Sequence, residues 1–216
     1  MGEPGIFSND QLRVLALLDE SRLRGDFYLA GGCAVAFHLE HRRSLDLDLF
    51  SLSPDVDLEG LLPVLVAAPF AAEVLSVTER SMRLLFGDLP VDLVRSSHVP
   101  LEAPIAGPSG FPTAGLLDLA SLKFAAVVHR GVRRDFWDIH AMLTAGGLDL
   151  DGALSAYVTR FGKQQSDPYA VLRALTYFSE AEKESVFPNG LTVEHWRAIR
   201  IFFRSEAPRV MLKRLS

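Results

Sequence analysis

FYLAGGCAVAFHLEHRRSLDLDLFS, residues 27–51, is the stretch of sequence that decides the fold. It begins with an apolar run of strand length, Phe27–Ala30, which is followed directly by Gly31-Gly32. The small residues from Cys33 to His41 then predict a helix. A strand that turns through two glycines into a short helix is typical of a mixed α/β core.

The second half of this stretch alternates strictly between apolar and other residues from Ser44 to Ser51. A period of two predicts a strand, with Leu45, Leu47 and Leu49 on one face and Asp46 and Asp48 on the other. Two carboxylates on one strand face are close enough to hold divalent cations jointly.

The glycine pair adds a second chemical feature to the two carboxylates. Gly31-Gly32 at a strand-to-helix turn allows backbone N–H groups to approach a phosphate, and the helix N-terminus favours negative charge there. A metal pair beside a phosphate site is the machinery of phosphoryl or nucleotidyl transfer. The alternative is a solvated strand face next to an incidental turn.

A third acid, Asp92, lies within the apolar run Val91-Asp92-Leu93-Val94. If its strand lies beside the strand of Asp46 and Asp48, it completes a three-carboxylate cluster and can take a proton from an attacking hydroxyl. Taken alone, Asp92 would be better explained as a solvent-facing acid on a half-buried strand.

The rest of the chain predicts two domains, a mixed α/β core, with a β-sheet flanked by helices, over residues 1–112 and a helical C-terminal subdomain over residues 113–216. Pro100 to Pro112 is rich in Pro and Gly and predicts the linker between them. A capping box at Ser8 and Gln11 predicts the first helix. The remaining predicted elements are a helix over 57–68, strands over 73–78, 82–86 and 89–94, and helices over 113–129, 133–143, 151–161, 168–178 and 193–203.

Composition excludes several classes of protein. The 216 residues are 49% hydrophobic and 23% charged, which is ordinary for a folded protein and unlike a disordered chain. The net charge of -5 disfavours wholesale coating of nucleic acid but allows local basic patches. The single cysteine, Cys33, suits a reducing compartment. Without an export signal or a membrane span in the sequence, we expect a cytoplasmic protein.

Lys123 lies close to the apolar stripe of its predicted helix, which contains Leu119, Leu122, Ala126 and Val127. A lysine in that position needs an anionic partner or extends its amine to water. Arg130, Arg133 and Arg134 supply local positive charge, as does a set of basic residues near the C-terminus: Arg197, Arg200, Arg204, Lys213 and Arg214. We expect most of these to be solvated, with some available to contact phosphates.

Four motifs in order resemble the nucleotidyltransferase superfamily, and more narrowly the AbiEii/AbiGii-type nucleotidyltransferase toxins, which include the MenT toxins. They are Gly31-Gly32, Ser44-x-Asp46-x-Asp48 with the later Asp92, Asp118-x-x-x-x-Lys123, and Arg130-Gly131-x-x-Arg134-Asp135-x-x-Asp138. The resemblance implies that Ser44 contacts the nucleotide phosphates with Gly31 and Gly32. It further implies that Asp46 and Asp48 ligate Mg²⁺, that Lys123 neutralises triphosphate charge, and that Asp135 is an active-site residue.

We therefore predict a Mg²⁺-dependent nucleotidyltransferase with two metals on Asp46, Asp48 and Asp92. It would transfer an NMP from an NTP to a hydroxyl acceptor in one step. The resemblance implies a toxin of a toxin–antitoxin or abortive-infection system, with RNA (tRNA in some relatives) as acceptor and a cognate antitoxin as a possible partner. Two alternatives stay open: transfer to a small molecule resembling an aminoglycoside, and a nucleotide-binding module without catalysis.

Overall fold

The structure is a computed structural model that describes residues 5–216. The chain divides into two compact units, one ending at Gly115 and one formed by Leu116–Ser216.

The first unit is built on a mixed seven-stranded sheet with the order β3-β4-β5-β2-β1-β7-β6. Its strands are β1 (Phe27–Ala30), β2 (Leu47–Ser51), β3 (Glu73–Val77), β4 (Ser81–Phe86), β5 (Leu89–Val94), β6 (Ile105–Ala106) and β7 (Pro112–Thr113). The pairs β2/β5 and β1/β7 are parallel, and the other pairs are antiparallel. The predicted mixed α/β class is therefore confirmed.

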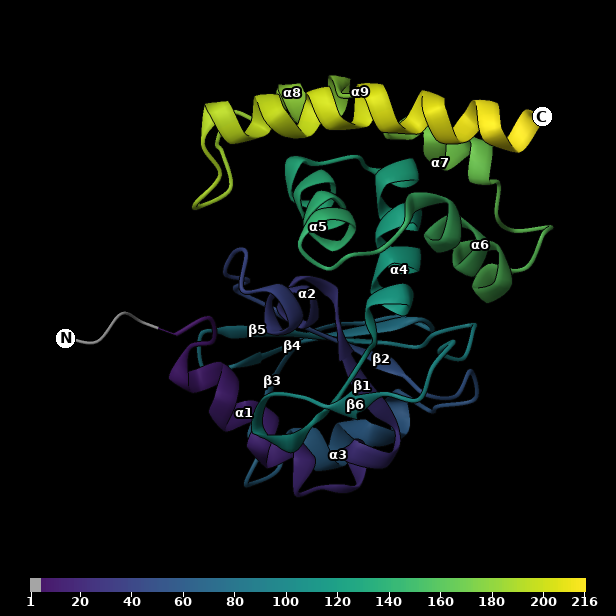
Figure 1. The fold of residues 1–216 in the computed structure, drawn as a ribbon. Helices are drawn as coiled ribbons and strands as arrows, with labels where there is room; N and C mark the ends of the chain where they lie inside the picture. The colour runs from purple at the N-terminus through teal and green to yellow at the C-terminus, as the bar shows by residue number, and fades with distance from the viewer. Residues whose placement is uncertain (1–4) are drawn as a thin grey trace. The chain divides into compact units, whose positions relative to one another are not determined.

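Helices cover both faces of this sheet. The α-helices of the unit are α1 (Asn9–Asp19), α2 (Gly31–Leu39) and α3 (Leu62–Leu65), and short 3-10 turns cover Arg22–Gly25, Glu59–Leu61 and Pro108–Gly110. Figure 1 shows α2 on one face of the sheet, with α1 and α3 on the other. The predicted capping box at the start of α1 is confirmed, because Ser8 and Gln11 each bond the other's backbone N–H through their side chains.

The strand that carries the acidic residues is shorter than predicted. β2 begins at Leu47 rather than Ser44, and Leu45 is 79% exposed instead of sharing a buried face with Leu47 and Leu49. The strand starts late because the backbone carbonyls of Ser44 and Asp46 accept hydrogen bonds from the side chains of Gln11 and Cys33 rather than from a neighbouring strand. Residues 44–46 therefore form a bend before β2.

Proline limits the helix that was predicted over residues 57–68. Only a 3-10 turn and the four residues of α3 are helical there. Pro69 has no N–H to donate to the carbonyl of Leu65, four residues earlier. That carbonyl instead accepts from the N–H of Ala72, at 2.9 Å.

The prediction that Pro100 to Pro112 is a linker is wrong. Its residues form β6 and the start of β7, and Ile105 and Ala106 pair with Thr113 and Pro112 at the edge of the sheet. Composition indicated a loop, but two short runs of extended backbone are enough to extend an existing sheet.

The second unit is helical throughout, as the periodicity predicted. Its helices are α4 (Leu116–His129), α5 (Arg133–Thr144), α6 (Leu150–Phe161), α7 (Pro168–Ala174), α8 (Ser179–Lys183) and α9 (Val193–Leu215). Phe136 is fully buried on α5, and its ring packs against those of Phe178, Trp196 and Phe203. α9 continues to Leu215 rather than ending at Phe203. No helix among residues 5–216 is long and apolar enough to cross a membrane.

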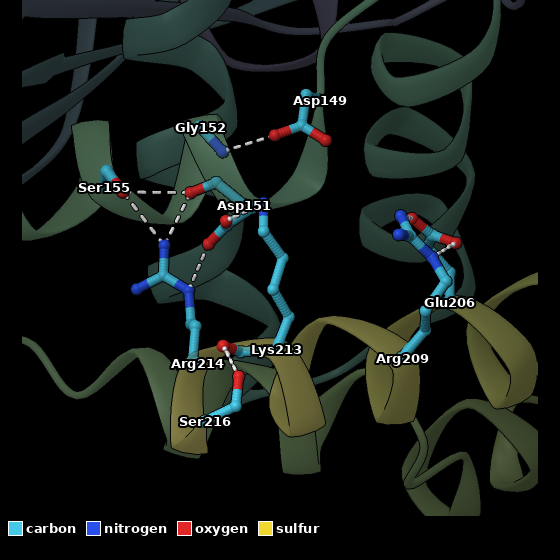
Figure 2. A network of polar contacts seen from close by, with 9 residues as sticks. All are labelled: Asp149, Asp151, Gly152, Ser155, Glu206, Arg209, Lys213, Arg214 and Ser216. Atoms are coloured by element: carbon cyan, nitrogen blue, oxygen red, sulfur yellow. Dashed lines mark hydrogen bonds and ion pairs between the residues drawn. The ribbon is translucent and has the colours of Figure 1, made fainter.

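The C-terminal end of α9 is attached to the start of α6 by polar contacts (Figure 2). Lys213 Nζ lies 2.7 Å from Asp151 Oδ2, and Arg214 Nε lies 2.5 Å from Asp151 Oδ1. Arg214 also donates to the backbone carbonyl of Asp151 and to Ser155 Oγ. The hydrogen bond from Lys213 and the charge of Arg214 lower the pKa of Asp151. We call Asp151, Ser155, Lys213 and Arg214 the α6–α9 clasp.

Candidate nucleotidyl-transfer site

The two glycines allow side chains from the strand of acidic residues to approach the start of α2. Gly31 has a φ of +60°, and a Cβ on it would overlap the carboxylate of Asp48. A Cβ on Gly32 would lie 2.5 Å from Ser44 Oγ and 2.6 Å from the guanidinium of Arg42. Only glycine leaves room for these groups against the backbone at the helix N-terminus, where an anion is favoured.

Asp46 and Asp48 flank the first residue of β2, and both are half-buried while Leu47 and Leu49 are buried. Ser44 Oγ donates to Asp46 Oδ1 at 3.0 Å, which fixes one of the two carboxylates. Ser44, Asp46 and Asp48 are thus gathered with Gly31 and Gly32 around one end of α2.

Asp92 lies on the neighbouring strand. β5 runs parallel to β2, and Asp92 is the register partner of Asp48. Its carboxylate is also bound by Arg83 of β4, with Nε to Oδ1 and Nη2 to Oδ2 both at 3.0 Å. No sequence pattern predicts this contact, because the pairing of β4 with β5 sets it.

These residues fit a Mg²⁺ site in part. Carboxylate oxygens are the ligands that Mg²⁺ prefers, and it is commonly held by one or two of them together with substrate phosphates. Asp46 and Asp48 supply such a pair. Within residues 5–216, no three His, Cys, Asp or Glu side chains are grouped so that they could hold a metal. Asp92 is next to the pair in register, but its two oxygens face Arg83.

Two buried side chains hold the bend that carries Ser44 and Asp46. Gln11 Nε2 donates to the carbonyl of Ser44 at 2.9 Å, and Cys33 Sγ donates to the carbonyl of Asp46 at 3.0 Å. Burial, together with the charge of Asp46, raises the pKa of Cys33 to about 12, so this thiol is a packed donor and not a nucleophile. Sequence reasoning placed Gln11 only in the capping box and missed this second contact.

Lys123 and Asp135 meet inside the helical unit. Lys123 is 7% exposed, and its Nζ lies 3.3 Å from Asp135 Oδ1 and 2.7 Å from Asp138 Oδ2. Arg130 also binds Asp135 through two hydrogen bonds of 2.8 and 2.9 Å. Burial alone would raise the pKa of Asp135, but the bonds and charges of Arg130 and Lys123 outweigh it and lower that pKa. The anionic partner that the position of Lys123 requires is therefore present on α5.

Four of the eight basic residues considered as phosphate contacts form ion pairs with acidic residues of their own unit. Arg130 binds Asp135, Arg200 binds Glu182 at 2.8 Å, and Lys213 and Arg214 belong to the α6–α9 clasp. Arg133 is buried, donates to the carbonyl of Glu184 and stacks on the ring of Phe187. The positive charge of the four paired residues is thus largely neutralised within the helical unit.

Comparisons with known proteins agree with the motifs. The family model for the nucleotidyl transferase AbiEii toxin of type IV toxin–antitoxin systems matches residues 13–211. An uncharacterised protein of Aquifex aeolicus (strain VF5) is 25% identical over 181 residues, which cover 83% of this chain and 85% of that protein.

Two solved structures are similar in fold. MenT4, a nucleotidyltransferase toxin of Mycobacterium tuberculosis H37Rv, matches with a TM-score of 0.56 and 16% identity over 92% of this chain and 81% of that one. The antibiotic-resistance factor ANT(2'')-Ia matches with a TM-score of 0.50 and 17% identity over 69% of this chain and 89% of that one.

Proposed function

Because the chain belongs to the AbiEii family of nucleotidyltransferase toxins, we propose that it transfers an NMP from a Mg²⁺-bound NTP to a hydroxyl of RNA. The observation that carries this proposal is the approach of the Asp48 carboxylate to the backbone of Gly31, beside the bonded pair Ser44 and Asp46. A carboxylate pair, the hydroxyl of Ser44 and the backbone of the glycine turn are brought together there.

We assign a separate role to each residue of the proposed site. The backbone at Gly31 and Gly32 and the hydroxyl of Ser44 bind the triphosphate, and Asp46 and Asp48 hold Mg²⁺. When bound, Mg²⁺ would neutralise phosphate charge as a Lewis acid. Asp92 accepts the proton of the attacking hydroxyl. By family resemblance Lys123 adds positive charge for the triphosphate, and Asp135, which binds that lysine, sets its position.

The reaction takes one displacement at the α-phosphorus. The acceptor oxygen forms a bond to the α-phosphorus. The bond between the α-phosphorus and the oxygen that bridges it to the β-phosphate breaks, and pyrophosphate leaves. A covalent nucleotidyl-enzyme through Cys33 is disfavoured, because that thiol is buried with a pKa of about 12. We therefore propose direct transfer to the acceptor.

RNA is the acceptor that the toxin family favours, and tRNA is the first candidate within it. We propose that the protein acts in the cytoplasm, with an antitoxin encoded nearby to oppose it. A small cationic molecule is the second candidate for the acceptor. The similarity in fold to the antibiotic-resistance factor ANT(2'')-Ia supports this alternative. A module that only binds nucleotide is disfavoured, because Asp46, Asp48 and Lys123 are all present.

The test incubates the protein with each α-labelled NTP, Mg²⁺ and total tRNA, and repeats the reaction with aminoglycosides. We expect label on RNA, with Asp48→Asn inactive and Asp88→Asn, an exposed acid in the β4–β5 turn, as the matched active control. Label on a small molecule and never on RNA would overturn the proposal that RNA is the acceptor. Nucleotide binding without any transfer would favour the non-catalytic alternative.

A further inference from the structure

Arg83 and Asp92 form a two-point ion pair across the antiparallel strands β4 and β5. Arg83 and Asp92 are register partners, and the guanidinium bonds both carboxylate oxygens at 3.0 Å. The Arg83 side chain is 54% exposed and that of Asp92 is 20% exposed, so the pair lies on an accessible face of the sheet. A fork of this kind fixes the direction of a carboxylate as well as neutralising it.

The same register places this pair beside the proposed cation ligands. Asp92 is flanked by Arg83 on β4 and by Asp48 on β2, so one row across three strands carries one cation and two anions. Side chains opposite each other on neighbouring strands are about 5 Å apart at Cβ, which is within range of direct interaction. Asp92 and then, more weakly, Asp46 and Asp48 raise the pKa of Arg83, so its charge acts on all three acids.

We infer that Arg83 is a positioning residue that competes with the divalent cation for Asp92. Without a cation, Arg83 neutralises one of three neighbouring carboxylates and directs Asp92 away from Asp48. When a cation binds to Asp46 and Asp48, Asp92 exchanges its bonds to Arg83 for the cation. This inference rests on the proposed function, because it takes Asp46 and Asp48 to hold the cation and adds Asp92 as a further ligand once the cation is bound.

The competition predicts opposite effects of two substitutions in the same ion pair. Asp92→Asn removes a ligand, so cation affinity falls. Arg83→Gln releases that ligand, so cation affinity rises, by about fivefold if the pair has the strength of an exposed bidentate bridge. A residue that only supported the sheet would lower affinity when it is replaced.

The experiment measures binding of Mn²⁺ to the full chain without nucleotide, from the loss of the electron paramagnetic resonance signal of free Mn²⁺. Arg95→Gln is the matched control, because Arg95 follows β5 and pairs with Glu79 at 2.8 Å rather than with the acids. It measures the effect of losing one positive charge on this sheet. Arg83→Gln is then repeated in the Asp92→Asn background, where no ligand remains to be released.

The expected result is tighter Mn²⁺ binding for Arg83→Gln than for Arg95→Gln, and loss of that difference in the Asp92→Asn background. Unchanged or weaker binding for Arg83→Gln would overturn the competition, as would a gain that persists without Asp92. The assay also separates this failure from failure of the site itself. If Asp48→Asn leaves Mn²⁺ affinity intact, the assignment of the cation site is wrong. If Asp48→Asn abolishes binding while Arg83→Gln matches its control, the site stands and only the role of Arg83 is refuted.

Discussion

Replacing Gly31 by alanine should damage the site and the fold together. An alanine would have to adopt a φ near +60°, and its Cβ would overlap the Asp48 carboxylate, with Asp48 Cγ at 2.6 Å and Cβ at 2.8 Å. The whole side chain of Asp48 would therefore have to move. The left-handed backbone costs about 1–2 kcal/mol for a residue with a Cβ. Overpacking adds about 1–3 kcal/mol, so we expect a loss of about 2–5 kcal/mol in the free energy of unfolding.

Two other glycines separate these contributions. Gly87 has a φ of +63° and open space around its added Cβ, so Gly87→Ala reports the backbone cost alone. Gly25 has neither a positive φ nor a contact, so Gly25→Ala reports the baseline for adding a methyl group. Urea unfolding of the three variants should rank Gly31→Ala as the least stable and Gly25→Ala as the most stable.

The functional part of the prediction uses the same variants. Because Gly31→Ala displaces a proposed ligand, we expect Mn²⁺ affinity to fall by about tenfold or more. Gly87→Ala and Gly25→Ala should bind Mn²⁺ as the parent does. If Gly31→Ala is no less stable than Gly87→Ala and keeps full Mn²⁺ affinity, the close approach of Asp48 to this turn is refuted.

Three further predictions concern buried or half-buried polar groups. Gln11→Ala should lower the free energy of unfolding by about 1–3 kcal/mol and weaken Mn²⁺ binding, because it leaves the buried carbonyl of Ser44 without its donor. Urea unfolding measures the first effect and Mn²⁺ titration the second. Intact Mn²⁺ binding would show that the bend holds without this donor. Lys123→Met should cost about 3–5 kcal/mol in urea unfolding, since it leaves two buried carboxylates with one cation fewer, and a loss below 1 kcal/mol would argue against a structural role. Burial, and then the charge of His195, lower the pKa of His140 below 6.5, so the unfolded chain binds more protons than the folded chain just below that pH. Stability should therefore be full above pH 6.5 and fall as the pH drops. His140→Gln should reduce the change in the urea unfolding midpoint between pH 7.5 and pH 5.5.

Local pattern was sufficient to predict the strand, the glycine turn and the helix at which Asp48 approaches Gly31, and the catalytic role of these residues stays a prediction. The glycine pair and the alternation around Asp46 and Asp48 are contained in one short stretch, so their geometry depends on few long-range contacts. The bend before β2 escaped prediction because Gln11 forms its hydrogen bond to Ser44 across 33 positions of sequence. An exposed Leu45 follows from that bond and not from the alternating pattern.

Contacts that depend on strand register or on helix packing could not be predicted from the sequence either. Arg83 meets Asp92 only because β4 and β5 pair in one register, and a shift of one residue would place them on opposite faces. On the helices, the position of Lys123 predicted a need for an anion, and a structure was required to show that Asp135 and Asp138 meet it within the same unit.

The α6–α9 clasp changes how the helical unit should come apart. The ends of a 23-residue helix ordinarily fray, and their amide protons then exchange with solvent far faster than those of the core. Here Lys213 and Arg214 bind a residue 62 and 63 positions earlier in the chain, which makes opening of the last turn of α9 depend on release of the first turn of α6. Amide exchange at Lys213 and Arg214 should accordingly be slow, and it should quicken together with exchange in α6 when Asp151 is replaced by asparagine.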